Sequence, residues 1–175
     1  MSRPSWDDNF LAISHVVAKR SKDTSTKLGA VIVGPDQEIR STGYNCFPRG
    51  INDAAPERYE RPEKYKWIEH AERNAIYNAA RMGTPLKDCS IYVAWIPCTA
   101  CSRAIIQVGI VEVVVEDPDV PERWRDDFTR SLTMLDEAGV RVRRLNDSTI
   151  LRPADILGAP PKDEESGATK GEPQG

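Results

Sequence analysis

The chain has 175 residues and a net charge of −3 at neutral pH. This acidic balance argues against a nucleic-acid-binding surface, which gains most of its affinity from clustered Lys and Arg, so a small substrate is favoured over a polymer. Four cysteines, no apolar N-terminal run and no long apolar span favour a cytoplasmic protein without a membrane segment. We expect one domain at residues 1–152 and a flexible tail at residues 153–175, where Gly, Pro and charged residues prevail.

The first part of the chain is predicted to form a helix, a hairpin and a long connection. Ser5 begins a capping box, and apolar residues at helical spacing follow it, so a helix is expected at residues 6–20. The apolar run at residues 28–33 is typical of a strand buried on both faces, and residues 38–44 suit its hairpin partner. Residues 51–69 are charged and aromatic without a clear period, and a connection of this length inside a compact domain is usually functional.

Helices and strands alternate in the rest of the domain. The expected elements are a helix at residues 69–82, a strand at 90–96, a helix at 97–108, a strand at 110–115, a helix at 121–138 and a strand at 140–145. Strands joined through a crossover helix run parallel, so most of the sheet should be parallel, with the first hairpin as the antiparallel exception. The predicted fold class is therefore α/β, a three-layer α/β/α sandwich around a five-stranded mixed sheet.

Two motifs stand where helices of this sandwich begin. His70-Ala71-Glu72 opens one helix, and Pro97-Cys98-Thr99-Ala100-Cys101 opens the next. Zn²⁺ takes imidazole and thiolate ligands in a tetrahedron, so one His and two Cys would leave the fourth position open to water. Glu72 is not needed as a ligand and can carry protons for that water. This pattern is the signature of zinc-dependent nucleobase deaminases.

These motifs have two other interpretations. A Cys-x-x-Cys pair can be a redox dithiol, but such a site has no use for His-x-Glu at the start of another helix. A closed structural zinc site would need a fourth ligand, for which Cys46, Cys89 and His15 are the candidates. Cys89 precedes the strand that leads to Pro97, so we expect it roughly 25 Å away, at about 3.3 Å per residue.

Together with Gly43-Tyr44-Asn45, these motifs resemble those of the deoxycytidylate (dCMP) deaminase family, over roughly residues 6–145. The resemblance implies a cytidine-deaminase-like fold, bound zinc and hydrolytic deamination of dCMP to dUMP with release of ammonia. It implies that His70, Cys98 and Cys101 bind the zinc and that Glu72 shuttles protons. It also implies a homo-oligomer, often a hexamer in the family.

The resemblance further implies how the substrate is held. Asn45 would contact the sugar, and the backbone N–H of Ala71 would meet the pyrimidine carbonyl. The phosphate dianion calls for Arg or Lys, and the candidates near the strand ends are Lys27, Arg123 and Arg125. Arg123 and Arg125 are favoured because they flank Trp124, in a segment where the family places part of its phosphate pocket.

One position departs from the family pattern. Members often carry Gly-Tyr-Asn-Gly in a loop tied to allosteric binding of deoxynucleoside triphosphates such as dCTP and dTTP, whereas Cys46 follows Asn45 here. A side chain in place of glycine restricts the backbone and the approach of a phosphate. This substitution argues against the usual regulation and could reshape the pocket for a modified base.

The zinc motif leaves other functions open. The substrate could be a 5-substituted dCMP, a free nucleoside, a purine nucleotide or an adenosine within tRNA, although the last would need a basic surface. A catalytically silent nucleotide-binding regulator is an alternative of a different class. Glu72 argues against a silent site, because loss of this carboxylate is the simplest way to abolish its chemistry.

Overall fold

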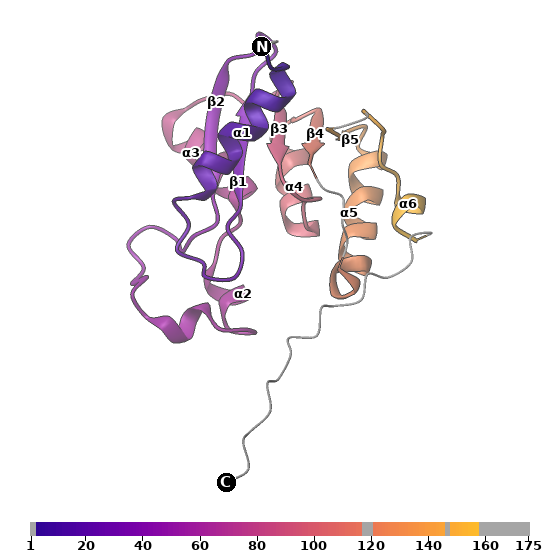
Figure 1. The fold of residues 1–175 in the computed structure, drawn as a ribbon. Helices are drawn as coiled ribbons and strands as arrows, with labels where there is room; N and C mark the ends of the chain where they lie inside the picture. Colours follow the sequence, from indigo (N-terminus) through magenta and orange to yellow (C-terminus); the bar gives the residue numbers. More distant parts are fainter. Residues whose placement is uncertain (1–2, 117–120, 146–147, 158–175) are drawn as a thin grey trace.

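The computed structural model of the chain describes residues 3–116, 121–145 and 148–157. Its elements, drawn in Figure 1, are α1 (Trp6–Ala18), β1 (Gly29–Val33), β2 (Ile39–Tyr44), the 3₁₀ helix η1 (Pro56–Tyr59), α2 (Lys64–Trp67), α3 (Ala71–Met82), β3 (Ser90–Val93), α4 (Thr99–Gln107), β4 (Glu112–Val115), the 3₁₀ helix η2 (Glu122–Trp124), α5 (Arg125–Glu137), β5 (Arg141–Arg144) and α6 (Pro153–Leu157). None of the helices in the described part of the chain is long and apolar enough to cross a membrane.

The five strands form one mixed sheet in the order β2-β1-β3-β4-β5. β3, β4 and β5 pair in parallel, whereas β1 is antiparallel to both of its neighbours. The prediction that the hairpin is the only antiparallel pairing is therefore wrong. The chain leaves β2 through α3 and returns beside β1 instead of β2, so β2 and β3 run in the same direction, as a crossover requires, with β1 between them.

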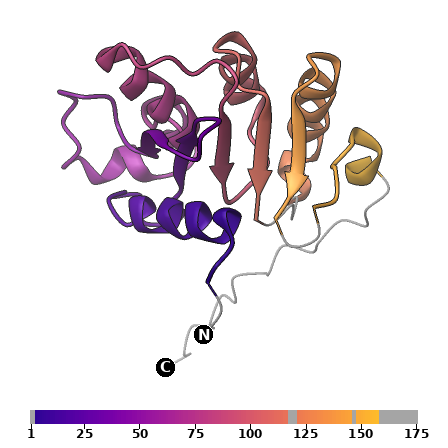
Figure 2. The same cartoon turned by 90° about the horizontal axis from the view of Figure 1, so that it is seen from above.

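Helices cover both faces of the sheet, which confirms the predicted three layers. Figure 2 shows α1 on one face and α3, α4 and α5 on the opposite face. Successive residues of a strand point to opposite faces, so Ala30 and Ile32 of β1 join the core under α3, α4 and α5. Val31 and Val33 pack with Phe10 of α1 on the other face. All five residues of β1 are buried, as its continuous apolar run predicts.

Most element boundaries agree with the sequence prediction to within two residues. The N-terminus of α1 is capped by Ser5, whose hydroxyl accepts a hydrogen bond from the Asp8 backbone N–H at 3.1 Å. The largest differences are in α5, which begins at Arg125 after the 3₁₀ helix η2 instead of at residue 121, and in β3, which ends at Val93, so residues 94–98 leave the sheet before α4. The first five residues of the predicted tail form α6, which packs against α5; the rest of the predicted tail, residues 158–175, lies outside the described residues.

Candidate active site

The two sequence motifs meet at the N-termini of neighbouring helices. His70 is the N-cap residue of α3, Cys98 is the N-cap residue of α4, and Cys101 lies in the first turn of α4. Neither cap side chain bonds back to its own helix, so both are available to one another. α3 can approach the sheet closely because β2 carries Gly43, where a Cβ atom would lie 2.3 Å from the carbonyl oxygen of Ala71.

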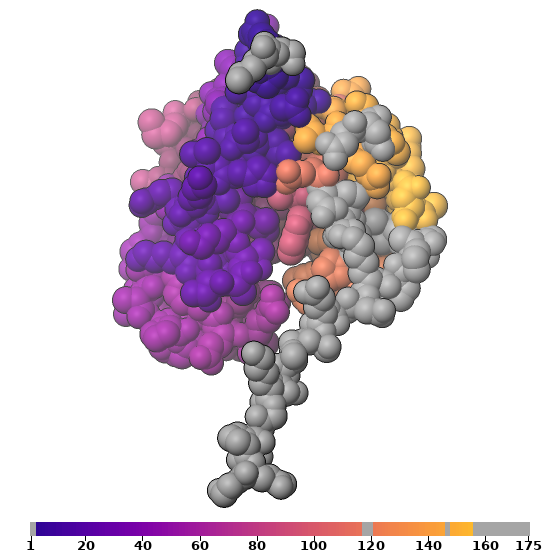
Figure 3. Space-filling view, in the orientation of Figure 1, coloured from indigo at the N-terminus to yellow at the C-terminus, as the bar shows by residue number. Residues whose placement is uncertain are grey.

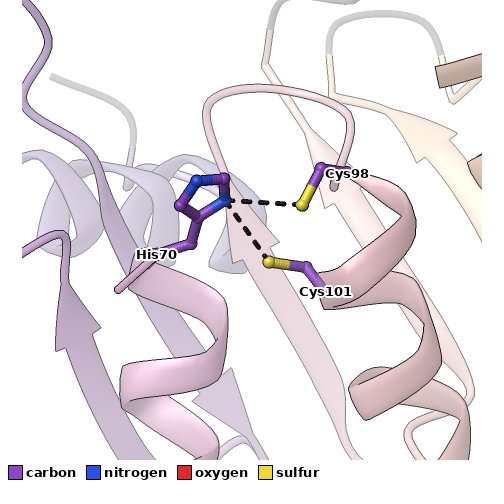
Figure 4. Close-up of side chains that lie close together, drawn as sticks. All are labelled: His70, Cys98 and Cys101. Atoms are coloured by element: carbon purple, nitrogen blue, oxygen red, sulfur yellow. Dashed lines mark hydrogen bonds between the residues drawn. The ribbon is translucent and has the colours of Figure 1, made fainter. Parts of the chain in front are cut away.

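The three predicted metal ligands converge. Nδ1 of His70 lies 3.4 Å from Sγ of Cys98 and 3.6 Å from Sγ of Cys101, as drawn in Figure 4. All three donor atoms lie within 4.8 Å of one another. One imidazole and two thiolates at this spacing suit a tetrahedral Zn²⁺ with one position left for a non-protein ligand.

The other candidate ligands lie in different surroundings. Among the described residues, the group able to hold a metal includes no fourth side chain. Cys46 receives a hydrogen bond from the amide of Asn74 at 3.4 Å, and His15 pairs with Glu116 at 2.8 Å. The sulfur of Cys89 lies 3.8 Å from the carbonyl oxygen of Lys87. This arrangement favours an open metal site over a closed structural one.

Hydrogen bonding within the group favours ionisation of one thiol. Bonds from Cys101 and His70 lower the pKa of Cys98 to about 3, against the opposing effect of burial. The bond to Cys98 raises the pKa of His70, and the bond between Cys101 and Cys98, together with burial, raises the pKa of Cys101. Cys98 is thus a ready thiolate, which is the form that binds a metal.

Glu72 lies beside this group, one residue into α3. Its side chain is only 7% exposed, and it lines the same cavity as His70 and Cys98. Burial raises the pKa of its carboxyl group, because the charged form loses its hydration. A carboxyl group that gains a proton more easily than usual is suited to general acid–base chemistry.

The cavity brings together some of the predicted substrate contacts and leaves others out. Asn45, Ala71 and Arg123 line it with the metal group. Lys27 is exposed and Arg125 pairs with Glu122 at 2.9 Å, and neither lines the cavity. Of the three predicted phosphate contacts, Arg123 is therefore the one that lines this cavity together with the metal group.

Asn45 lines the cavity and is also hydrogen-bonded to the protein backbone. Its Oδ1 accepts a hydrogen bond from the Leu28 N–H at 2.8 Å, and its Nδ2 donates to the Thr26 carbonyl at 2.8 Å. These bonds fix the loop that leads into β1. An amide oxygen has two lone pairs, so Oδ1 keeps one acceptor position for a substrate hydroxyl.

The zinc-binding region of cytidine and deoxycytidylate deaminases matches residues 4–117 of the sequence. The chain belongs to this deaminase family. It is 37% identical to the deoxycytidylate deaminase of Homo sapiens over 144 residues, which is 79% of each chain. It is 38% identical to an uncharacterised deaminase of Aliivibrio fischeri, over 87% of this chain and 97% of that one.

The fold of this deaminase is shared with solved structures. The dCMP deaminase of cyanophage S-TIM5, in complex with dCMP and dUMP, aligns with a TM-score of 0.66 and 22% identity. The alignment covers 82% of this chain and 99% of the cyanophage chain. The expected cytidine-deaminase-like sandwich and the family of hydrolytic, zinc-dependent deaminases are thereby confirmed.

The deaminase positions its cysteine turn with residues that the sequence analysis did not identify. Asp127 of α5 accepts bonds from the backbone N–H and the hydroxyl of Thr99, at 3.0 and 2.7 Å. Ser131, one turn further along α5, donates to the carbonyl oxygen of Pro97 at 2.6 Å. These two polar residues lie on the buried side of a helix whose apolar spacing predicted only packing, so the pattern gave no sign of their second role.

A buried ion pair at the opposite wall was also missed. The ammonium group of Lys64 lies 2.8 Å from a carboxylate oxygen of Asp23, and both side chains are almost fully buried. The two residues are 41 positions apart, in segments with no periodic pattern. The one signal in the sequence is that Lys64 lies within a long connection, because such connections are usually functional.

Proposed function

We propose that the protein removes the amino group of dCMP by hydrolysis and releases dUMP and ammonia. The observation that carries the proposal is the convergence of His70, Cys98 and Cys101 beside the buried carboxyl of Glu72 in one cavity. The membership of the chain in the deaminase family supports it, as does its similarity to the human deoxycytidylate deaminase. The cyanophage enzyme of the same fold binds dCMP and dUMP.

The three metal ligands have fixed roles in this proposal. His70, Cys98 and Cys101 would hold Zn²⁺, which would lower the pKa of water and so make a nucleophile available at neutral pH. The two cysteines bind as thiolates, and the His70 imidazole binds in its neutral form. Two thiolates balance the charge of the ion and weaken its effect on water, so the reaction depends strongly on a protein base.

Glu72 provides that base and later acts as an acid. Its carboxylate accepts a proton from the attacking water and passes it to the ring nitrogen beside the amino-bearing carbon, while the water oxygen bonds to that carbon. The carboxyl group then delivers the second water proton to the departing amino group. The C–N bond breaks, ammonia leaves and a carbonyl group remains, so one water is consumed for each dUMP formed.

Residues around the metal group orient the base and the sugar. The backbone N–H of Ala71 is in the first turn of α3, where it has no partner within the helix, and it donates to the pyrimidine carbonyl. The free lone pair of Asn45 Oδ1 accepts a bond from a sugar hydroxyl. Arg123 binds the phosphate, whereas Lys27 and Arg125 contribute at most through their longer-range charge, because they lie outside the cavity lining.

The test is ammonia release from a panel of substrates by the zinc-loaded protein. The panel contains dCMP, CMP, deoxycytidine, 5-methyl-dCMP, dAMP and dGMP. We expect dCMP to give the highest kcat/KM, since both the ring and the phosphate find partners in the cavity. A protein that prefers a purine nucleotide, or one that releases no ammonia from any of the six, would contradict the proposal.

The same assay tests regulation by dCTP and dTTP. Cys46 borders a second cavity that also carries basic side chains, and Asp23 and Asn45 border both cavities. Cys46 is not among the residues with positive φ, so its backbone does not need a glycine there. Its side chain instead occupies room beside the cavity, and we expect the usual triphosphate regulation to be weak or absent.

The cellular setting and assembly are part of the proposal. The four cysteines, Cys46, Cys89, Cys98 and Cys101, are free thiols, which favours a reducing compartment such as the cytoplasm. We also infer a homo-oligomer, with a hexamer as the expected state. Sedimentation of the purified protein measures the assembly directly.

A further inference from the structure

The connection between β2 and α3 forms one wall of the active-site cavity. This segment, residues 51–69, contains η1 and α2 and lies at one end of the sandwich (Figure 1). Arg61, Lys64 and Tyr65 of this segment line the cavity together with the metal group. In the space-filling view, the magenta surface of the segment and the orange surface of α5 face each other across a hollow (Figure 3).

Hydrogen bonds from Lys64 attach this segment to the rest of the protein. Its ammonium group donates to Asp23 Oδ2 at 2.8 Å and to the hydroxyl of Ser25 at 2.6 Å. Asp23 in turn accepts bonds from the backbone N–H groups of Ser25 and Thr26, at 2.9 and 3.1 Å. A four-residue helix is not stable alone, so these bonds fix α2 against the loop that leads into β1.

An aromatic contact ties the same wall to the opposite side of the cavity. The ring of Tyr65 meets the ring of Trp124 edge-on, with their centroids 5.9 Å apart. Trp124 directly follows Arg123 in the chain, and Arg61 lies four residues before Tyr65. The contact therefore brings two arginines from distant parts of the sequence to the lining of one cavity.

The charges of the cavity suit a dianion at this place. Lys64 is neutralised by Asp23, and Glu72 lies beside the metal ligands. The guanidinium of Arg61 is exposed and makes no ion pair with any residue that the structure describes. Arg61 thus brings a positive charge to the lining that no described acidic side chain pairs with, and a guanidinium matches the oxygens of a phosphate group in pairs.

We propose that Arg61 binds the 5′-phosphate of the substrate and makes the enzyme select nucleoside monophosphates over nucleosides, with Lys64 as the positioning residue that holds it there. The inference rests on the proposed deamination and extends it to the side chain that reads the phosphate. Arg61 and Arg123 then bind the phosphate from two sides of the cavity, while the base lies at the metal group. A nucleoside has no phosphate and is bound only through its base and sugar.

The experiment compares the wild type with Arg61→Gln and Arg61→Lys. The quantity measured is kcat/KM for dCMP divided by kcat/KM for deoxycytidine. We expect Arg61→Gln to lower this ratio at least about tenfold, because a bond to a charged group is lost, while activity on deoxycytidine stays within about twofold. Arg61→Lys keeps the charge without the paired geometry and should restore part of the ratio.

Lys66→Gln is the matched control. Lys66 lies in α2, in the same segment as Arg61; its side chain is 71% exposed, and it pairs with Glu63 outside the cavity lining. Its substitution removes the same charge from the same segment, so the ratio should not change. Calorimetric binding of dUMP and of deoxyuridine gives a second measurement, in which Arg61→Gln should weaken only dUMP.

Lys64→Met tests the positioning role. Since Lys64 acts through Arg61, combining the two substitutions should lower the substrate ratio little further than Arg61→Gln alone. If the wild type deaminates dCMP and Arg61→Gln has the same substrate ratio as the wild type, the inference is overturned and the proposed function stays intact. A wild type inactive on dCMP would instead refute the proposed function, and the inference with it.

Discussion

The two walls of the active site are built in different ways. On one wall, His70, Glu72, Cys98 and Cys101 stand at the starts of α3 and α4, within two short sequence motifs. On the other, residues 51–69 form short helices that are held by a buried ion pair and an aromatic contact. The first wall is made by local structure, and the second by contacts between residues far apart in the chain.

Because the walls are built differently, we expect the first wall to carry the reaction and the second wall to select the substrate. Helix starts on a packed sheet hold the predicted metal ligands and the predicted proton carrier within a rigid layer, where burial and hydrogen bonds shift their pKa values. The wall at residues 51–69 has little apolar core of its own, and its position depends on a few polar and aromatic contacts. Substitutions on the first wall should therefore stop the reaction, and those on the second should change stability and substrate preference.

The largest effect is expected for Glu72→Gln. The amide keeps the shape of the side chain but cannot carry protons, so kcat should fall about 10³-fold. Bound zinc and the thermal midpoint should be unchanged or higher, because a buried charge is removed without touching a ligand. The matched control is Glu116→Gln, a half-exposed partner of His15, which should retain wild-type kcat. Substantial turnover by Glu72→Gln would show that another group moves the protons.

A smaller effect, on stability, is expected for Lys64→Met. Removal of the ammonium leaves Asp23 buried without its ion-pair partner, which should cost about 3 kcal/mol of unfolding free energy. Chemical denaturation of the purified variant measures this loss. The exposed neighbour gives the comparison, since Lys66→Met should change stability by less than about 0.5 kcal/mol. Equal midpoints for the two variants would mean that the ion pair does not hold this wall.

The smallest effect is a pH dependence that comes from the same ion pair. Burial raises the pKa of Asp23, but hydrogen bonds from Lys64 and Ser25 outweigh it and hold the pKa below its usual value of 3.8. A carboxyl group with a lowered pKa in the folded state stabilises the protein above its unfolded pKa and loses that contribution as the pH falls.

The unfolding free energy of the wild type should thus decline as the pH falls below about 5. The decline should be shallower in the double variant Asp23→Asn/Lys64→Met, which lacks both charges and has nothing to titrate at this position. Denaturation curves at several pH values compare the two proteins. Parallel declines would assign the pH dependence to other carboxyl groups, such as Asp7, whose pKa is also lowered.

How far the sequence predicts the structure depends on the range of the interactions. Gly83 ends α3 in the left-handed conformation, and Ser5 caps α1, as local rules indicate. The place of β1 between β2 and β3 could not be predicted, because periodicity identifies a strand and its buried faces but not its neighbours in the sheet. Arg125 is a similar case. Its position beside Trp124 in the sequence suggested that it contacts the substrate phosphate, but in the structure its side chain pairs with Glu122.

By itself, the sequence determined the layers of the fold and predicted the metal ligands and the proton carrier. The layers follow from the alternation of helices and strands, and each of the two site motifs is a spacing within one helix start. Only the tertiary structure decided which residues form the opposite wall. The contacts of Asp23, Lys64 and Tyr65 join segments that lie tens of residues apart in the chain. No local sequence pattern predicts such contacts.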